Sequence, residues 1–204
     1  MIACPLILAS KSKARRQLLE NAGVSFEVAD SHVDEDKIKQ EMSGCPLIEI
    51  ATSLAQAKAL AVSSSNPSSY IIGADQILGL KGEGFDKPKS MDEATERLKH
   101  FSNKTHVLHT SLCIARENTI IWSCTDVPEL KMRKLTDVEI CTYLECAGEN
   151  VLTSVGAYQL ESYGIQLFED IRGSYFSILG LPLLPLLRFL QKEKLTGFSN
   201  ERQN

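Results

Sequence analysis

The chain has 204 residues, of which 43% are hydrophobic and 24% are charged, a composition typical of a globular protein. Its net charge is −4 and no long basic stripe is present, which argues against nucleic acid as a partner. The most apolar segment, residues 176–190, is too short and too often interrupted by glycine and proline to span a membrane. With no signal peptide at its start, the sequence predicts a soluble, cytoplasmic protein.

The six cysteines have no CxxC spacing, and four of them lie in apolar segments. This pattern predicts reduced core thiols rather than disulfides or zinc ligands. The residues are Cys4, Cys45, Cys113, Cys124, Cys141 and Cys146.

Residues 5–23 combine a short strand with the start of a helix. The apolar run at 6–9 predicts a buried strand, and the helical pattern that follows Ser12 ends at Gly23. Ser12 can cap this helix, whose first turn carries several cations, including Arg15. Cations are unfavourable at a helix N-terminus unless an anion lies among them. The junction therefore favours a phosphate, and the alternative is a solvated basic helix start with Ser12 as an ordinary cap.

Alternating residues at 24–28 predict a second strand, which is followed by three acidic residues at 34–36. Such a patch is usually a solvated loop, and the alternative is that Glu35 faces a metal ion or a water. A helix is predicted at residues 47–62. In its middle, Lys58 either extends to solvent or supplies a positive charge for phosphate. The predicted apolar face of this helix comprises Ile50, Leu54, Ala57 and Ala61.

A single carboxylate interrupts the apolar strand predicted at residues 70–78. Aspartate is disfavoured within strands, and its burial is costly without a partner. Asp75 is therefore the residue that the sequence marks most strongly as functional.

The rest of the chain predicts further strands and helices without a linker, and hence a single domain over residues 1–204 with a polar tail from about residue 195. Alternation in three successive strands indicates an antiparallel meander. His106 and His109 lack a metal-binding spacing and are predicted to be structural. The predicted elements are a hairpin tip at 81–85, a helix at 90–99, strands at 105–115, 119–127 and 129–134, a helix at 136–147 and a terminal helix from 182.

Seven segments between residues 6 and 190 resemble, in order, the Maf family of nucleoside triphosphate pyrophosphatases. They are LILASKSKARRQLL, VDE, ATSLAQAKA, GADQIL, DKP, GAYQLESYG and GSYFSILGLPL. The resemblance implies a mixed α/β fold, with a long twisted sheet, flanking helices and two lobes around a central cleft, similar to the inosine triphosphatases. It also implies a house-cleaning hydrolase that splits the α–β phosphate bond with Mg²⁺ or Mn²⁺ and forms a homodimer.

The resemblance also implies roles for individual residues. Asp75 matches the carboxylate usually assigned as proton acceptor, and Glu35 matches an acidic residue that would bind the metal together with Asp75. Charge neutralisation by cations and a metal held by few carboxylates suits attack on a triphosphate. Whether Asp75 accepts a proton or mainly holds the metal stays open. The implied phosphate-binding residues are Ser10, Ser12, Arg15, Lys58 and Lys87.

Three positions resemble those that select the base in this family. Many members have arginine at the position of Ala14, threonine at Gln76 and glutamine at Glu161. Gln76 with Glu161 is similar to the branch acting on 7-methyl-GTP, although that branch tends to have tryptophan at Ala14. A carboxylate can accept hydrogen bonds from the ring N–H and amino group of a guanine-type base. We therefore expect a purine-type or modified triphosphate rather than dTTP or UTP.

Two alternatives stay open. An inosine triphosphatase-like hydrolase would need the same cation but would prefer a different base. A nucleotide-binding regulator of cell division, with vestigial hydrolysis, could keep the cations yet would not need the carboxylates of Glu35 and Asp75.

Overall fold

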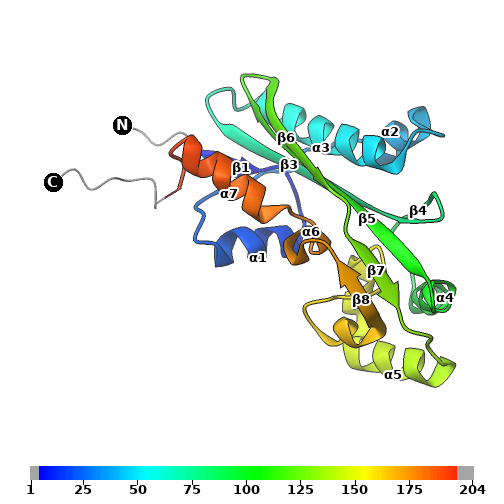
Figure 1. Ribbon diagram of the computed structural model, residues 1–204. Helices are drawn as coiled ribbons and strands as arrows, with labels where there is room; N and C mark the ends of the chain where they lie inside the picture. The colour runs from blue at the N-terminus through cyan, green and yellow to red at the C-terminus, as the bar shows by residue number, and fades with distance from the viewer. Residues whose placement is uncertain (1–4, 197–204) are drawn as a thin grey trace. The chain divides into compact units, whose positions relative to one another are not determined.

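The computed structural model describes residues 5–196, which form two compact units. Of these residues, unit 1 contains 5–76, 110–126 and 174–196, and unit 2 contains 77–109 and 127–173. The strands form a mixed eight-stranded sheet in the order β2-β1-β3-β5-β7-β8, with β4 paired to β3 and β6 to β5 (Figure 1). The predicted mixed α/β fold is thus confirmed. No helix within residues 5–196 has the length and hydropathy needed to cross a membrane.

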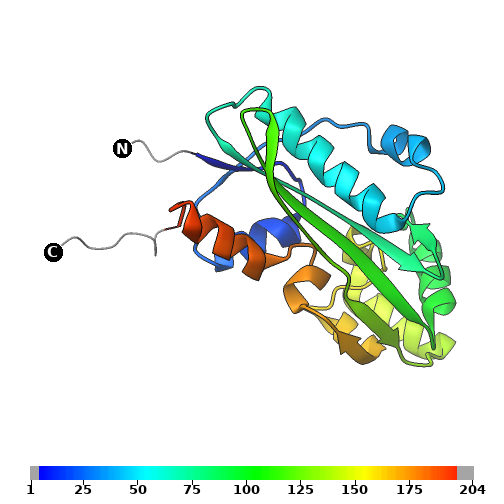
Figure 2. The same ribbon diagram turned by 45° about the horizontal axis from the view of Figure 1, so that its top comes forward.

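Unit 1 contains a central group of strands with helices on both faces (Figures 1 and 2). Its elements are β1 (Leu6–Leu8), α1 (Lys13–Asn21), β2 (Glu27–Val28), α2 (Glu35–Glu41), α3 (Leu47–Ser63), most of β3 (Tyr70–Leu80) and of β5 (Thr105–Arg116), β6 (Thr119–Asp126), α6 (Tyr175–Ile178) and α7 (Leu183–Lys192).

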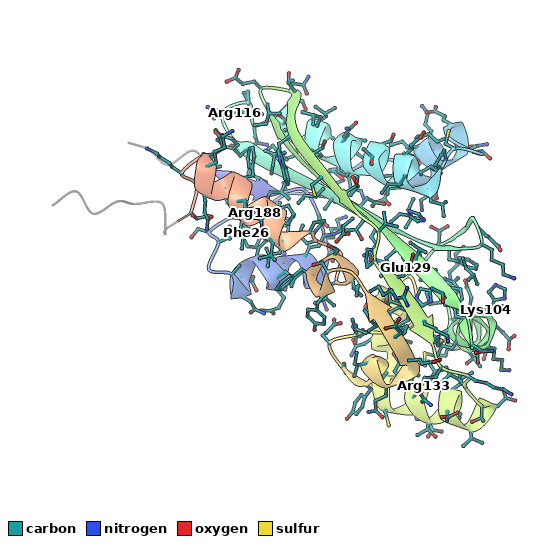
Figure 3. All side chains as sticks on the ribbon, in the orientation of Figure 1. Phe26, Lys104, Arg116, Glu129, Arg133 and Arg188 are labelled. Carbon is teal, nitrogen blue, oxygen red and sulfur yellow. The ribbon has the colours of Figure 1, made fainter. Side chains whose placement is uncertain are left out.

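Side chains that alternate along these strands divide the core of unit 1 into two layers. Leu6 and Leu8 of β1 pack with α1 and α7, and Phe26 packs against the same cluster (Figure 3). Ile7 and Ala9 point the other way and pack with α3. Because β3 and β5 follow the same alternation, each strand position determines which helix a side chain meets.

Gly73 in β3 allows α3 to approach the sheet closely. A Cβ at this position would lie 2.2 Å from the carbonyl oxygen of Ala55 and 2.7 Å from the Cβ of Ala59. Both alanines are fully buried. Since alternate residues of a strand share a face, Asp75 projects from β3 toward α3, as Gly73 does.

Unit 2 contains the end of β3, β4 (Glu83–Phe85), α4 (Met91–Phe101), the start of β5, β7 (Glu129–Met132), α5 (Asp137–Ala147), two 3-10 helices η1 (Gly148–Thr153) and η2 (Tyr163–Leu167), and β8 (Phe168–Arg172). The predicted hairpin tip is confirmed: Lys81 and Gly82 have φ angles of 54° and 85°, as a tight turn between paired strands requires. Ser90 caps α4, and Thr136 forms a capping box at the start of α5.

The predicted meander is wrong. β6 pairs with residues 110–116 of β5, whereas β7 pairs with residues 105–107 of the same strand and with β8. Pro128 separates β6 from β7, and its carbonyl accepts a hydrogen bond from Leu108 N at 3.0 Å. Alternation predicts strands but not their partners, so two successive strands that share one long neighbour look like a meander in the sequence.

Two further predictions fail in part. The second strand covers only Glu27–Val28 rather than residues 24–28. The five described cysteines carry free thiols, as predicted, but Cys113 is the buried one among them, and three are exposed. Cys4 and most of the predicted tail lie outside the described residues.

His106 is buried in the core of unit 2, where the charged form of its ring is unfavourable. Its Nε2 lies 2.7 Å from the hydroxyl of Tyr158, and its ring stacks on Phe101 with centroids 5.0 Å apart. Its Nδ1 is buried without a hydrogen-bond partner in the described residues. Burial lowers the pKa of His106 from 6.5 to about 4.

We expect this histidine to make unfolding depend on pH. The unfolded chain takes up a proton on this histidine near pH 6.5, whereas the folded chain does so only near pH 4. The free energy of unfolding is therefore highest above pH 6.5 and falls as the pH decreases toward 4. Between about pH 7.5 and pH 5, His106 lowers the free energy of unfolding by about 2 kcal/mol. Urea unfolding at both pH values, compared between the wild type and His106→Gln, measures this difference. An equal pH dependence in the two proteins contradicts the prediction.

Candidate active site

The junction between β1 and α1 is built around two serine hydroxyls. Ser12 caps α1 as predicted, because its Oγ accepts a hydrogen bond from Arg15 N at 3.4 Å. Ser10 Oγ accepts from Ser12 N at 3.3 Å and from Arg15 Nη1 at 3.1 Å. The first turn of α1 contains no acidic residue. The helix N-terminus thus keeps its positive end free of side-chain carboxylates, which suits an anion.

Arg15 is buried and held by main-chain carbonyls. Its Nε donates to Gly180 O at 2.8 Å, and its Nη1 donates to Ala74 O at 2.9 Å. Burial lowers the pKa of Arg15, while the charges of Asp75 and Glu35 oppose this shift. Nη2 has no hydrogen-bond partner within residues 5–196. Arg15 therefore joins Gly180 to the backbone next to Asp75, and its Nη2 is not used by the described residues.

A buried lysine joins two carboxylates from different elements. Lys58 Nζ in α3 lies 2.6 Å from Asp75 Oδ1 in β3 and 2.8 Å from Glu35 Oε1 at the start of α2. The side chains of Lys58 and Asp75 are 9% and 10% exposed, and that of Glu35 is 44% exposed. The alternative in which Lys58 extends to solvent is therefore wrong.

The buried face of α3 and the acidic patch both differ from the predictions. The buried face of α3 contains Lys58 and faces β3, so Ala61 is exposed and Ala57 is half-buried. The acidic patch begins a helix rather than forming a loop, since Asp34 caps α2 by accepting from Lys37 N at 3.0 Å. Carboxylates are favourable at this position because they complement the helix dipole.

Each of the two carboxylates has one oxygen that could bind a divalent cation such as Mg²⁺. Each uses one oxygen for Lys58, and the second oxygens, Asp75 Oδ2 and Glu35 Oε2, have no partner in the described part of the chain. In the same residues, no group of three or more His, Cys, Asp or Glu side chains could hold a metal. Mg²⁺ is typically held by one or two carboxylates together with substrate oxygens rather than by a full protein cage. The donor set fits that mode of binding.

Gln76 points to the opposite face of β3 from Asp75. Its Nε2 lies within hydrogen-bond distance of Thr110 Oγ1 at 2.8 Å, Ser177 O at 2.8 Å and Ile178 O at 3.2 Å. Two of these partners are carbonyls, which only accept, so the nitrogen rather than the oxygen of the amide must face them. The Oε1 of Gln76 has no hydrogen-bond partner among residues 5–196. Ala14 is half-buried in the first turn of α1.

The remaining predicted site residues belong to unit 2. Lys87 is exposed between β4 and α4, and Glu161 is exposed between η1 and η2. The other predicted residues belong to unit 1, where Arg15 lies near enough to Asp75 and Glu35 for their charges to oppose the lowering of its pKa. The sequence did not point to Thr110 and Ser177 as partners of Gln76, since they lie far along the chain and carry no local signal.

Comparison with known proteins gives a consistent result over nearly the whole chain. A family model described as Maf-like protein matches residues 5–193. A nucleoside triphosphate pyrophosphatase of Rhodopseudomonas palustris (strain HaA2) is 42% identical over 194 residues, which are 95% of this chain and 96% of that protein. A 7-methyl-GTP pyrophosphatase of Brucella suis biovar 1 (strain 1330) is 46% identical over 191 residues, 93% of this chain and 96% of that protein. With this coverage and the residues at β1, α3 and β3, the chain belongs to the Maf family.

Proposed function

We propose that this protein is a nucleoside triphosphate pyrophosphatase that cleaves the α–β phosphate bond, yielding a nucleoside monophosphate and pyrophosphate. The names of its relatives support this activity. The observation that carries the proposal is the ion-pair chain Glu35–Lys58–Asp75, with Lys58 and Asp75 buried, which adjoins a helix N-terminus suited to phosphate. A protein that only binds nucleotide would not need two carboxylates on one buried ammonium group.

In the proposed mechanism, Asp75 accepts the proton of the water that attacks phosphorus. Lys58 holds Asp75 Oδ1, which leaves Oδ2 to face the water. Ser10, Ser12 and Nη2 of Arg15 bind phosphate oxygens, and Lys87 is a further proposed phosphate-binding residue. A Mg²⁺ or Mn²⁺ ion, when bound, would neutralise charge on the triphosphate. Glu35 and Asp75 are the residues that would hold it.

We propose a purine-type or modified base, of the 7-methyl-GTP kind, as the preferred substrate. Because the amide nitrogen of Gln76 is already bonded to α6 and β5, Gln76 can offer a base only its carbonyl oxygen. Glu161 is likewise an acceptor. Acceptors of this kind match the ring N–H and amino donors of guanine-type bases. Ala14, a small residue in α1, would leave space for the base.

The experiment that tests the activity is pyrophosphate release from dTTP, UTP, CTP, GTP, 7-methyl-GTP and ITP. It is run with Mg²⁺, with Mn²⁺ and with a chelator. We expect metal-dependent release with a preference for a guanine-type nucleotide. Inactivity with every nucleotide, combined with tight binding of one, would favour the regulator instead.

Glu161→Gln is expected to weaken the preference for 7-methyl-GTP. The substitution keeps the shape of the side chain but replaces an acceptor oxygen with an amide donor, which cannot pair with the amino group of guanine. We expect kcat/KM for 7-methyl-GTP, relative to UTP, to fall by about tenfold or more. Steady-state kinetics with both nucleotides measure the ratio, and Glu145→Gln on the exposed face of α5 is the matched control. An unchanged ratio would exclude Glu161 from base recognition.

A further inference from the structure

Arg97 in α4 of unit 2 is a charged residue with an unusually complete set of contacts. Its side chain is 9% exposed, and its guanidinium lies over the ring of Phe85, 5.0 Å from the centroid. Its Nη2 lies 3.3 Å from Glu93 Oε1. Burial lowers its pKa, and the nearby charges of Glu93, Asp86 and Glu83 oppose the shift. A guanidinium in this setting has a fixed position.

One nitrogen of this group binds two separate segments of the chain. Nη1 donates to the carbonyl of Asp86 at 2.6 Å and to the carbonyl of Val155 at 2.7 Å. Asp86 directly precedes Lys87, and Val155 lies six residues before Glu161. Both hydrogens of Nη1 are therefore used to tie together the two segments of unit 2 that carry predicted substrate-binding residues.

Each segment has a second attachment that limits its freedom. On the far side of Lys87, Lys89 N donates to Glu93 Oε2 at 3.0 Å, so α4 holds residues 86–89 from both ends. In the other segment, the buried Tyr158 is bonded to His106. Lys87 itself remains exposed between two fixed points. The contacts thus restrain the backbone, while the ammonium group of Lys87 has no partner within residues 5–196.

We infer that Arg97 is a positioning residue, which sets Lys87 and Glu161 in a fixed relation to each other, and this inference rests on the proposed function of those two residues. Arg97 touches no substrate in this role. It acts by fixing the main chain on either side of the two groups, and a small displacement of a positioned group is enough to lower catalysis strongly.

Arg97→Met tests the inference, with Lys99→Met as the control, because Lys99 lies on the same helix in an exposed pair with Glu96. We expect Arg97→Met to lower kcat/KM for the preferred nucleotide by about 10- to 100-fold. In a background of Lys87→Met with Glu161→Gln, the same change should alter kcat/KM by less than about threefold, since nothing is left to position. Hydrogen exchange should become faster in residues 86–89 and 155–161 together.

The outcomes separate this inference from the proposed function. Equal loss of activity in both backgrounds, or unchanged exchange in either segment, overturns the role of Arg97 while the enzyme remains active. A wild-type protein that hydrolyses no nucleotide overturns the proposed function instead, and that result does not depend on any Arg97 variant.

Discussion

Asp75→Asn is expected to abolish pyrophosphate release while leaving the protein folded. Asparagine keeps an oxygen that can accept the hydrogen bond of Lys58, so the contact between β3 and α3 survives. It cannot accept a proton from water at neutral pH, and it is a poor ligand for a divalent cation. Loss of a positioned general base typically lowers the rate by about 10²- to 10⁴-fold. We expect kcat to fall by at least the lower of these factors.

The measurement is pyrophosphate release under saturating nucleotide, with urea unfolding of the same preparation. Asp36→Asn is the matched control, because Asp36 is an exposed carboxylate in the first turn of α2. It should leave kcat within about twofold of wild type, as surface substitutions usually do. A wild-type rate in Asp75→Asn would remove Asp75 from the site.

Lys58→Met is expected to destabilise the protein as well as inactivate it. Methionine fills a similar space but leaves the buried carboxylate of Asp75 without its cation. Removing one partner of a buried ion pair typically costs about 3–5 kcal/mol. Urea unfolding should show a loss in this range, and no metal-dependent release of pyrophosphate should remain.

A second substitution separates the charge from the packing. Lys58→Met combined with Asp75→Leu removes both charges, and its unfolding free energy should return to within about 1–2 kcal/mol of wild type. The double variant should still be inactive. Lys37→Met, at an exposed lysine in α2, is the control and should change stability by less than about 0.5 kcal/mol. A double variant whose losses simply add would show that the ion pair is not the source of the instability.

Local signals in the sequence predicted the elements that make up the site. Ser12 and Gly23 mark the two ends of α1 through capping and a positive φ angle, and both are properties of single residues. The lone carboxylate of Asp75 stands out in an apolar strand because its burial needs a partner. Family resemblance then supplied the roles that chemistry alone left open.

Non-local contacts could not be predicted in this way. Nothing near Arg15 indicates that its guanidinium binds the carbonyls of Ala74 and Gly180, since main-chain acceptors have no residue-type signal. The partners of Gln76 are hidden for the same reason. The failed meander shows the same limit for strands, because alternation along β7 does not reveal which neighbour it pairs with.

Gly73 suggests how similar sites could be found in other sequences. The reach of a lysine side chain is fixed, so Lys58 can bond to Asp75 only where helix and strand lie this close, and a Cβ at Gly73 would push them apart. In the sequence, the close approach of helix and strand corresponds to a glycine two residues before the aspartate. It also corresponds to alanines three residues before and one residue after the lysine. A search for G-x-D in a strand that follows A-x-x-K-A in a helix would therefore detect the spacing as well as the charges. Transplanting the ionisable residues without the glycine would place them out of reach of each other.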